Sequence, residues 1–202
     1  MTTQIVRRSN RKVIVVGLAV LVIIALSAWR FTGGHFDVPF VRKQQGWTIG
    51  IYYGESPTHF FPPPGVGNPV LTARDVTDVQ AQFVADPFMI SENSTWYMFF
   101  EVKNAATQQG DIGLATSPDA LHWTYRQIVL DEPFHLSYPY VFKWDGRLYL
   151  LPESAQGSAV RLYEAVQFPT QWRFVTNLIS NVNFVDPSAF VINMRDNGKV
   201  YE

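Results

Sequence analysis

Two aspartates in this chain occupy the same local context, each directly before a proline. Asp86 precedes Pro87, Asp186 precedes Pro187, and Tyr138 fills the equivalent place before Pro139. Two carboxyl groups held roughly 6.5–9.5 Å apart can serve as the general acid and general base of inverting glycoside hydrolysis. Like charges that share a site also raise each other's proton affinity, so an acid and a base can coexist near neutral pH. We therefore predict Asp86 and Asp186 as hypothetical catalytic carboxylates, the alternative being that each caps the turn before a strand.

A second set of polar residues follows the same spacing. Glu101 and Glu153 lie 52 residues apart (153 − 101), and His135 stands just before Tyr138. We predict Glu101, His135, Tyr138 and Glu153 as substrate-binding residues that contact sugar hydroxyls or a sugar face. The alternative for the two glutamates is a structural one, in which they bind backbone amides of neighbouring repeats.

The spacing extends to the whole chain and indicates an internal repeat. Pro87, Pro139 and Pro187 lie 52 (139 − 87) and 48 (187 − 139) residues apart, and each introduces short aromatic strands. A period near fifty residues made of such strands is typical of propeller blades. The predicted strands cover residues 83–90, 95–101, 111–116 and 122–129, then 138–143, 147–152, 159–165 and 172–176, then 187–192 and 199–202. Asp145-Gly146 and Asp196-Asn197-Gly198 are the predicted hairpin turns.

These strands predict an all-β fold, a partial five-bladed β-propeller of about two and a half blades. Equivalent positions of successive blades converge on the propeller axis, which would bring Asp86, Tyr138 and Asp186 together at its mouth. Residues 47–53 are predicted as a leading strand of the kind that closes a propeller ring, and residues 57–69, rich in proline and glycine, as an unpaired connector. Because two blades and part of a third cannot close, we expect a fragment of a longer protein or blades from another chain.

The amino terminus predicts a membrane anchor. Residues 13–29 carry no charge over 17 positions, Arg7, Arg8, Arg11 and Lys12 precede them, and Arg30 follows. This length just spans a bilayer, and the charge asymmetry keeps residues 1–12 cytoplasmic and places the rest outside or in a lumen. Residues 30–46 are then a stalk and residues 47–202 the propeller domain. A cleaved signal peptide is the alternative.

Composition excludes several other functions. The chain of 202 residues holds 16 basic and 17 acidic residues and no cysteine. A formal charge of −1 without a basic patch argues against nucleic acid as a partner, and thiolate metal sites are excluded. Four histidines without ligand spacing predict neither a metal nor a cofactor.

Several longer stretches carry a family resemblance. Ala85-Asp86-Pro87 and Asp186-Pro187-Ser188 resemble the five-bladed glycosidases of the arabinanase and β-xylosidase clan, in which the first of these motifs holds the general base and the second tunes the acid, a glutamate of the fourth blade. Residues 47–202 resemble more closely the amino-terminal domain of the glucosamine inositolphosphorylceramide transferase family. The stretches that carry this resemblance are Trp47-Thr48-Ile49-Gly50-Ile51-Tyr52, Asn68-Pro69-Val70-Leu71, Ala85-Asp86-Pro87-Phe88-Met89, Phe99-Phe100-Glu101, Gly110-Asp111-Ile112-Gly113, residues 134–142 and Leu151-Pro152-Glu153-Ser154.

The resemblance implies a membrane-anchored domain that recognises a carbohydrate or glycolipid in the service of glycosyl transfer, beside a sugar-modifying catalytic domain. Whether the chain is itself an enzyme stays open at this point. The alternatives are an inverting glycoside hydrolase that lacks its general acid here, and a non-catalytic scaffold for a sugar-modifying partner.

Overall fold

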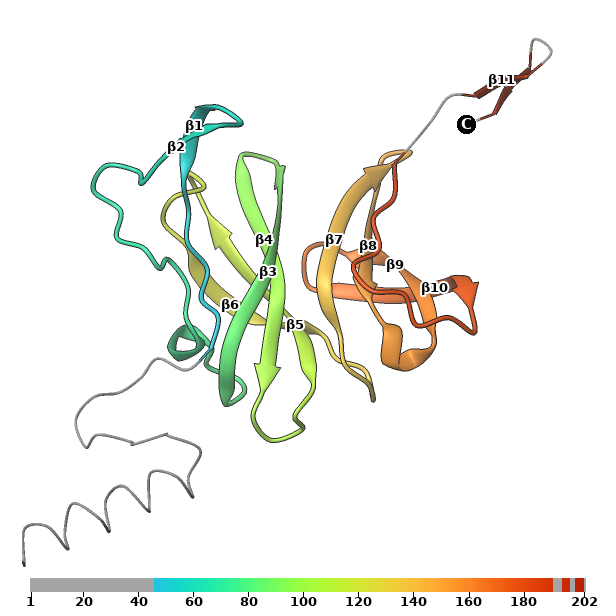
Figure 1. Cartoon of the computed structure of the whole chain (residues 1–202), viewed down its shortest axis with the longest axis horizontal. Coiled ribbons are helices and arrows are strands. Elements are labelled where there is room, and N and C mark those ends of the chain that lie inside the picture. Colours follow the sequence, from blue (N-terminus) through green and yellow to red (C-terminus); the bar gives the residue numbers. More distant parts are fainter. Residues whose placement is uncertain (1–45, 191–193, 197–198, 202) are drawn as a thin grey trace, which may run out of the picture. The chain divides into compact units, whose positions relative to one another are not determined.

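The predicted all-β class is confirmed. The computed structural model describes residues 46–190, 194–196 and 199–201, and within them only two short 3-10 helices interrupt the β-structure (Figure 1). The elements are β1 (Tyr53–Ser56), β2 (His59–Phe61), η1 (Ala73–Asp75), β3 (Ala81–Glu92), β4 (Thr95–Asn104), β5 (Gly110–Ser117), β6 (Thr124–Leu130), β7 (Ser137–Trp144), β8 (Arg147–Glu153), η2 (Ala155–Gly157), β9 (Ala159–Gln167), β10 (Gln171–Ser180), β11 (Met194–Asp196) and β12 (Lys199–Tyr201).

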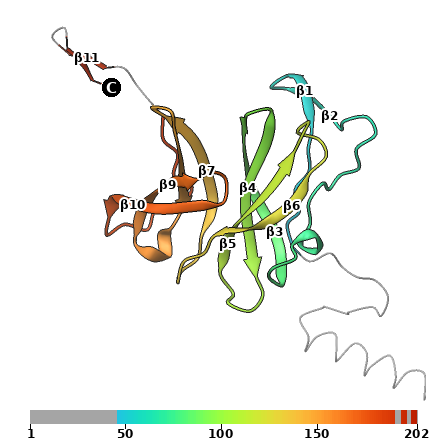
Figure 2. The same cartoon turned by 180° about the vertical axis from the view of Figure 1, so that it is seen from behind.

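The first two repeats each form a four-stranded antiparallel sheet. Strands β3 to β6 pair in chain order to make the first sheet, and β7 to β10 pair in chain order to make the second (Figures 1 and 2). All eight strands predicted for these repeats are confirmed, most of them a few residues longer than expected. Alternating aromatic and β-branched residues favour this pairing, since they fit a pleated surface. Among the described residues the sheets do not close into a ring.

The first hairpin of each sheet has the same turn. Asp145 and Gly146 connect β7 to β8 with φ of 46° and 73°, and Asn93 and Ser94 connect β3 to β4 with φ of 51° and 61°. Two consecutive residues with positive φ match the right-handed twist of paired strands. The predicted Asp145-Gly146 hairpin is therefore confirmed.

The third repeat differs from the prediction. Residues 187–190 belong to no strand, and residues 191–193 lie outside the described part of the chain. The strand predicted at residues 199–202 is present as β12, which pairs with the short strand β11. A predicted strand needs a neighbour to satisfy its backbone groups, and residues 187–190 pair with no strand of the described part of the chain.

The prediction for the leading segment is also corrected. Residues 47–53 are not one strand: Ile49 forms a single bridge with Leu71, and β1 begins only at Tyr53. Part of the predicted connector is paired, because β2 pairs with β1. The amide of Asn68 binds both the N–H and the carbonyl of Ile51, at 2.8 Å each. A side-chain amide thus replaces the strand partner that the backbone of Ile51 lacks.

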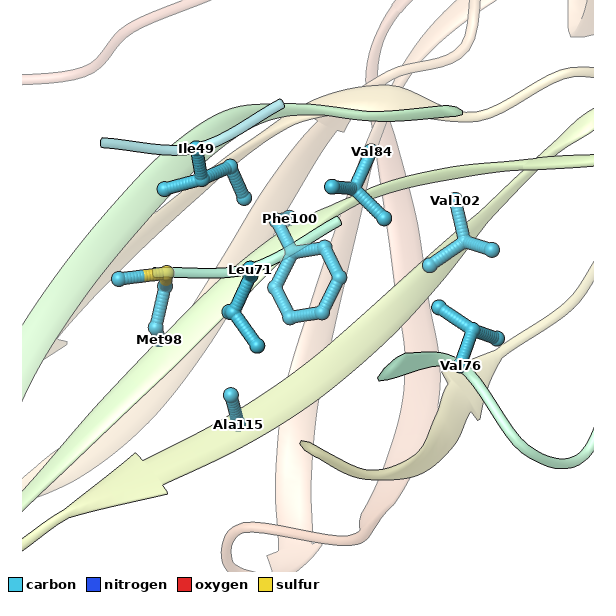
Figure 3. Packing of buried hydrophobic residues seen from close by; sticks show 8 residues of the cluster. All are labelled: Ile49, Leu71, Val76, Val84, Met98, Phe100, Val102 and Ala115. Atoms are coloured by element: carbon cyan, nitrogen blue, oxygen red, sulfur yellow. The ribbon is translucent and has the colours of Figure 1, made fainter. Parts of the chain in front are cut away.

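One face of the first sheet packs against this leading segment. The cluster contains the eight buried side chains in Figure 3, which are Ile49, Leu71, Val76, Val84, Met98, Phe100, Val102 and Ala115. Ile49 and Leu71 are each only 2% exposed. Burial of aliphatic side chains contributes about 1.5–3 kcal/mol each, so this cluster ties the leading segment to the first sheet.

The opposite face of the first sheet packs against the second sheet. The shared cluster contains Phe99, Ile112, Leu114, Leu130, Leu136, Val141, Leu150 and Tyr163. Trp172 of β10 contacts Phe99 edge to face, with ring centroids 5.4 Å apart. At the rim, Lys143 donates to both carboxylate oxygens of Glu92, at 3.0 and 2.9 Å. This ion pair places the ends of β3 and β7 side by side.

No helix of the described residues is long and apolar enough for a membrane crossing. The predicted anchor at residues 13–29 and the basic tail at residues 1–12 lie outside the described part of the chain, as does the predicted stalk at residues 30–46 except for Gly46.

Candidate functional site

The three residues before the repeated prolines share an uncommon backbone conformation. Asp86, Tyr138 and Asp186 have φ of 52°, 45° and 51°. Positive φ is unfavourable for residues other than glycine, and strained positions of this kind gather at functional sites. In the first two repeats the position also coincides with a shift of strand register, between Ala85 and Phe88 and between Ser137 and Tyr140. The equivalence predicted from the prolines is thus present in the backbone.

Carboxylates connect these positions from one repeat to the next. The backbone N–H of Tyr138 donates to Oδ2 of Asp86 at 3.3 Å. The backbone N–H of Asp186 donates to Oε2 of Glu153 at 3.4 Å. The alternative prediction that Asp86 caps its own turn is therefore replaced by a bond to an amide 52 residues away. Glu153 thus binds a backbone amide of the neighbouring repeat, as the structural alternative for the two glutamates predicts.

Glu101 is the most deeply buried carboxyl group of this site. Glu101 lies on β4, where it pairs with Ala85 of β3, and its side chain is only 6% exposed. Burial, followed by the charge of Asp86, raises its pKa from an ordinary value near 4.5 to about 7, against a smaller opposing effect of Lys103. At neutral pH this group can donate as well as accept a hydrogen bond.

His135 faces Glu101. Its Nδ1 accepts the backbone N–H of Gly110 at 2.8 Å, and its Nε2 lies 3.4 Å from Oε1 of Glu101. Because Nδ1 is an acceptor, the proton of the neutral ring is on Nε2 and is directed at the glutamate. Burial, then the charge of Lys103, lowers the pKa of His135, which favours this neutral form.

Gly110 is required where these groups meet. A Cβ atom at this position would lie 2.2 Å from the carbonyl oxygen of Leu136 and 2.8 Å from Cε1 of His135. The backbone of β5 therefore approaches the segment before β7 more closely than any side chain allows. This approach orients His135 toward Glu101.

Glu153 occupies the equivalent place in the second sheet, opposite Ser137. Its pKa is raised by burial, an effect that the hydrogen bond from Asp186 opposes. Glu101 and Glu153 are close enough for the charge of Glu153 to raise the pKa of Glu101. The two repeats therefore place their carboxyl groups in one electrostatic neighbourhood.

The two predicted catalytic aspartates make no hydrogen bond to each other among the described residues. Each bonds across a repeat boundary instead, as the acceptor for Tyr138 or the donor to Glu153. Their catalytic role stays a prediction. No group of three or more histidine, aspartate or glutamate side chains in the described part of the chain has the arrangement of a metal site.

Tyr138 packs more than the sequence suggested. Its ring lies edge to face against Phe88 with centroids 4.7 Å apart, and the neighbouring Tyr140 donates its hydroxyl to the carbonyl of Ala189 at 2.8 Å. These aromatic rings hold the start of β7 against β3 and against the third repeat. A sugar contact by Tyr138 stays a prediction.

A pocket of about 520 Å³ opens beside Asp86 and Glu101. Its lining residues are Trp47, Thr48, Ile49, Gly50, Phe83, Ala85, Asp86, Pro87 and Glu101. Trp47 was predicted only as part of the leading strand and not as a site residue, yet it lines this pocket. The sequence indicated a binding role for Trp47 only through its type and position, as a single aromatic residue between the polar stalk and the first repeat.

The chain was compared with known protein families and proteins. The family model for "Glucosamine inositolphosphorylceramide transferase 1, N-terminal" matches residues 41–200. Glucosamine inositolphosphorylceramide transferase 1 of Oryza sativa subsp. japonica is 41% identical over 148 residues, which are 66% of this chain and 20% of the rice protein. Its counterpart in Arabidopsis thaliana is 40% identical over 146 residues, 65% of this chain and 19% of that protein. The chain thus spans about a fifth of the length of the curated relatives it matches.

Solved structures with a similar arrangement are more distant. A GH32 β-fructofuranosidase of Bombyx mori matches with a TM-score of 0.47 and 16% identity, over 74% of this chain and 34% of that chain. A family 117 glycoside hydrolase of Zobellia galactanivorans matches with a TM-score of 0.40 and 16% identity, over 46% of this chain and 38% of that chain.

Proposed function

Because the chain belongs to the family of the amino-terminal domain of glucosamine inositolphosphorylceramide transferase 1, we propose that it recognises a carbohydrate or glycolipid in the service of glycosyl transfer. Asp86 and Glu101 bind the saccharide in the pocket of the first repeat. His135 orients Glu101, and Tyr138, Glu153 and Asp186 extend the same polar rim into the next repeats. In this proposal the two sheets are blades of a partial five-bladed propeller.

The observation that carries the proposal is the buried carboxyl group of Glu101 beside an open pocket. Burial of a charge is unfavourable unless it is paired, and Glu101 has only a weak partner at 3.4 Å, the neutral ring of His135. A sugar hydroxyl is a suitable partner, because it donates to the ionised group and accepts from the protonated one. Asp86 supplies a second acceptor in the same pocket.

Binding alone does not require catalysis by this chain. The relatives carry about four fifths of their length outside the matched region. We propose that a partner catalytic domain carries out the sugar transfer. The propeller domain of the present chain then holds the acceptor or donor near that catalytic domain. Residues 13–29 anchor the assembly in the membrane, with residues 1–12 cytoplasmic and the remainder outside or in a lumen.

The proposal is tested by ligand binding to the full chain in detergent. Glucosamine, free inositol phosphate and micellar inositolphosphorylceramide are offered to the wild type and to the double variant Asp86→Asn/Asp186→Asn. Asparagine tolerates positive φ, so it removes the charges with little strain. Loss of a hydrogen bond to a charged group is expected to weaken binding about tenfold or more.

Asp145→Asn is the matched control, since Asp145 also has positive φ, at 46°, but lies in the β7–β8 turn. It should bind as the wild type does. A double variant that binds every saccharide probe as tightly as the wild type would remove the proposed site.

A further inference from the structure

Trp47 is an exposed aromatic residue that lines the pocket beside Asp86 and Glu101. Its side chain is 72% exposed, more than that of any other tryptophan among the exposed large hydrophobic residues, and it lines the pocket that contains Asp86 and Glu101. It makes no aromatic contact among the described residues. A large apolar ring left in water is unfavourable, which raises the question of what covers it.

The backbone holds Trp47 at this place. Its carbonyl oxygen accepts the N–H of Val84 at 3.3 Å, and Ile49 two residues later is buried in the core cluster. Gly46 before it has φ of 121°, and a Cβ there would lie 2.6 Å from Cβ of Phe83. Trp47 is therefore presented from a segment that is fixed to β3, and little ordering is needed when a ligand arrives.

The charged groups of the pocket have one sign. Asp86 and Glu101 are the charged lining residues, and no lysine or arginine is among them. The nearest cation that acts on Glu101 is Lys103, whose Nζ donates to the carbonyl of Gln108 at 2.7 Å instead. A phosphate would meet carboxylates without a compensating cation, whereas a neutral or cationic group would be attracted.

The buried carboxyl of Glu101 is a second, independent indication of a ligand. It is more than nine-tenths buried, lines the pocket, and receives no hydrogen bond among the described residues beyond the 3.4 Å approach of His135. A pyranose ring has a C–H face that packs on aromatic rings and a rim of hydroxyl or amino groups that bind carboxyls. The lining of this pocket offers a partner for each, Trp47 for the C–H face and Asp86 and Glu101 for the rim.

We propose that Trp47 is the stacking platform of the pocket, and that the pocket takes one neutral or cationic sugar ring, such as an amino sugar, in preference to a phosphorylated inositol. The inference rests on the proposed function and assigns to this pocket the sugar end of the ligand. A phosphoinositol headgroup would then be held elsewhere in the larger protein or in the membrane.

The test uses the full chain in detergent, with glucosamine and inositol phosphate as separate soluble probes. Trp47→Ala should weaken glucosamine binding roughly fivefold to tenfold, and Trp47→Phe, which keeps an aromatic face, should weaken it less. The tryptophan fluorescence change on glucosamine binding should disappear in Trp47→Phe. Phe60→Ala is the matched control, because Phe60 is 59% exposed in the same leading segment and does not line the pocket.

The outcomes separate the two proposals. A wild type that binds no saccharide overturns the proposed function and this inference together. A wild type that binds glucosamine as tightly as Trp47→Ala does overturns the stacking platform alone. Tighter binding of inositol phosphate than of glucosamine overturns the charge preference. Circular dichroism of each variant shows whether the fold is kept, as the high exposure of Trp47 leads us to expect.

Discussion

The two four-stranded sheets have the same strand order but different surroundings. The first sheet is covered on both faces, by the leading segment on one and by the second sheet on the other. The second sheet has one face against the first. Leu130 of β6 and Ile179 of β10 occupy equivalent positions, because Leu130 pairs with Ile112 and Ile179 pairs with Val160. Leu130 is nevertheless only 9% exposed, whereas Ile179 is 44% exposed.

The comparison shows that burial in this repeat is decided by the neighbour and not by the strand itself. Both positions carry a large aliphatic residue, because each repeat is suited to stacking. Other apolar residues of β10 are exposed as well, among them Phe174 and Leu178. A repeat of this kind reaches its full stability only between two neighbours.

The largest expected effect concerns the close approach of β5 to the site. Gly110 is the first residue of β5, and Ser158 directly precedes β9. The two residues occupy equivalent positions in the two sheets. Gly110→Ala should lower the free energy of unfolding by about 3 kcal/mol or more, because its Cβ would collide with the backbone of Leu136. Ser158→Ala should change it by less than about 1 kcal/mol, since Ser158 is exposed. Denaturant unfolding of the full chain measures both, and equal effects would contradict the proposed difference between the surroundings of these two positions.

An intermediate effect compares the two aliphatic positions directly. Leu130→Ala should destabilise the full chain by about 2–4 kcal/mol, because it leaves a cavity between the sheets. Ile179→Ala should cost less than about 1 kcal/mol, because water already reaches that side chain. Thermal and denaturant unfolding are the measurements. A cost for Ile179→Ala as large as that for Leu130→Ala would show that something covers β10 in solution.

The smallest effect is a pH dependence that distinguishes the two glutamates. Between its ordinary pKa near 4.5 and the raised pKa of about 7, Glu101 holds a proton in the folded state that it has lost in the unfolded state. Stability therefore falls as pH rises through this window, by roughly 1 to 3 kcal/mol, and the loss is complete above the folded pKa. Glu101→Gln should remove this slope.

Glu153→Gln is the control for this measurement. The pKa of Glu153 is raised by burial too, but the hydrogen bond from Asp186 opposes the rise. Glu153→Gln should therefore keep most of the wild-type dependence of the free energy of unfolding on pH, measured by urea titrations at successive pH values. Asp111, whose pKa burial raises to about 6, contributes a slope of the same sign that both variants retain. An unchanged slope in Glu101→Gln would exclude Glu101 as its source.

The strands and turns of the two complete repeats could be predicted because their causes are local. Alternation of aromatic and β-branched residues specifies a strand, and Asp145-Gly146 specifies its turn. The misses have a different origin. Residues 47–53 and 187–190 have strand-like composition but lack a neighbouring strand along their length, and pairing depends on that neighbour. Asn68 provides the missing partner for Ile51 through a side chain, which no periodicity reveals.

For the candidate site, the equivalence of the pre-proline positions could be predicted, and the contacts that these residues make could not. The spacing of Asp86, Tyr138 and Asp186 indicated equivalent positions, and all three share positive φ. It could not show that Asp86 accepts a hydrogen bond from Tyr138, that His135 faces Glu101, or that Trp47 lies at the pocket. Those contacts join residues from different repeats and from the leading segment.

The sequence by itself determined a repeated all-β chain with a short-range pattern of strands, turns and pre-proline residues, because these follow from backbone preferences within a few residues. The tertiary structure alone decided which carboxyl group is buried and which aromatic residue remains open to a ligand. Desolvation and electrostatic neighbourhood depend on segments tens of residues apart, as the pairing of Glu101 with His135 beside Gly110 shows.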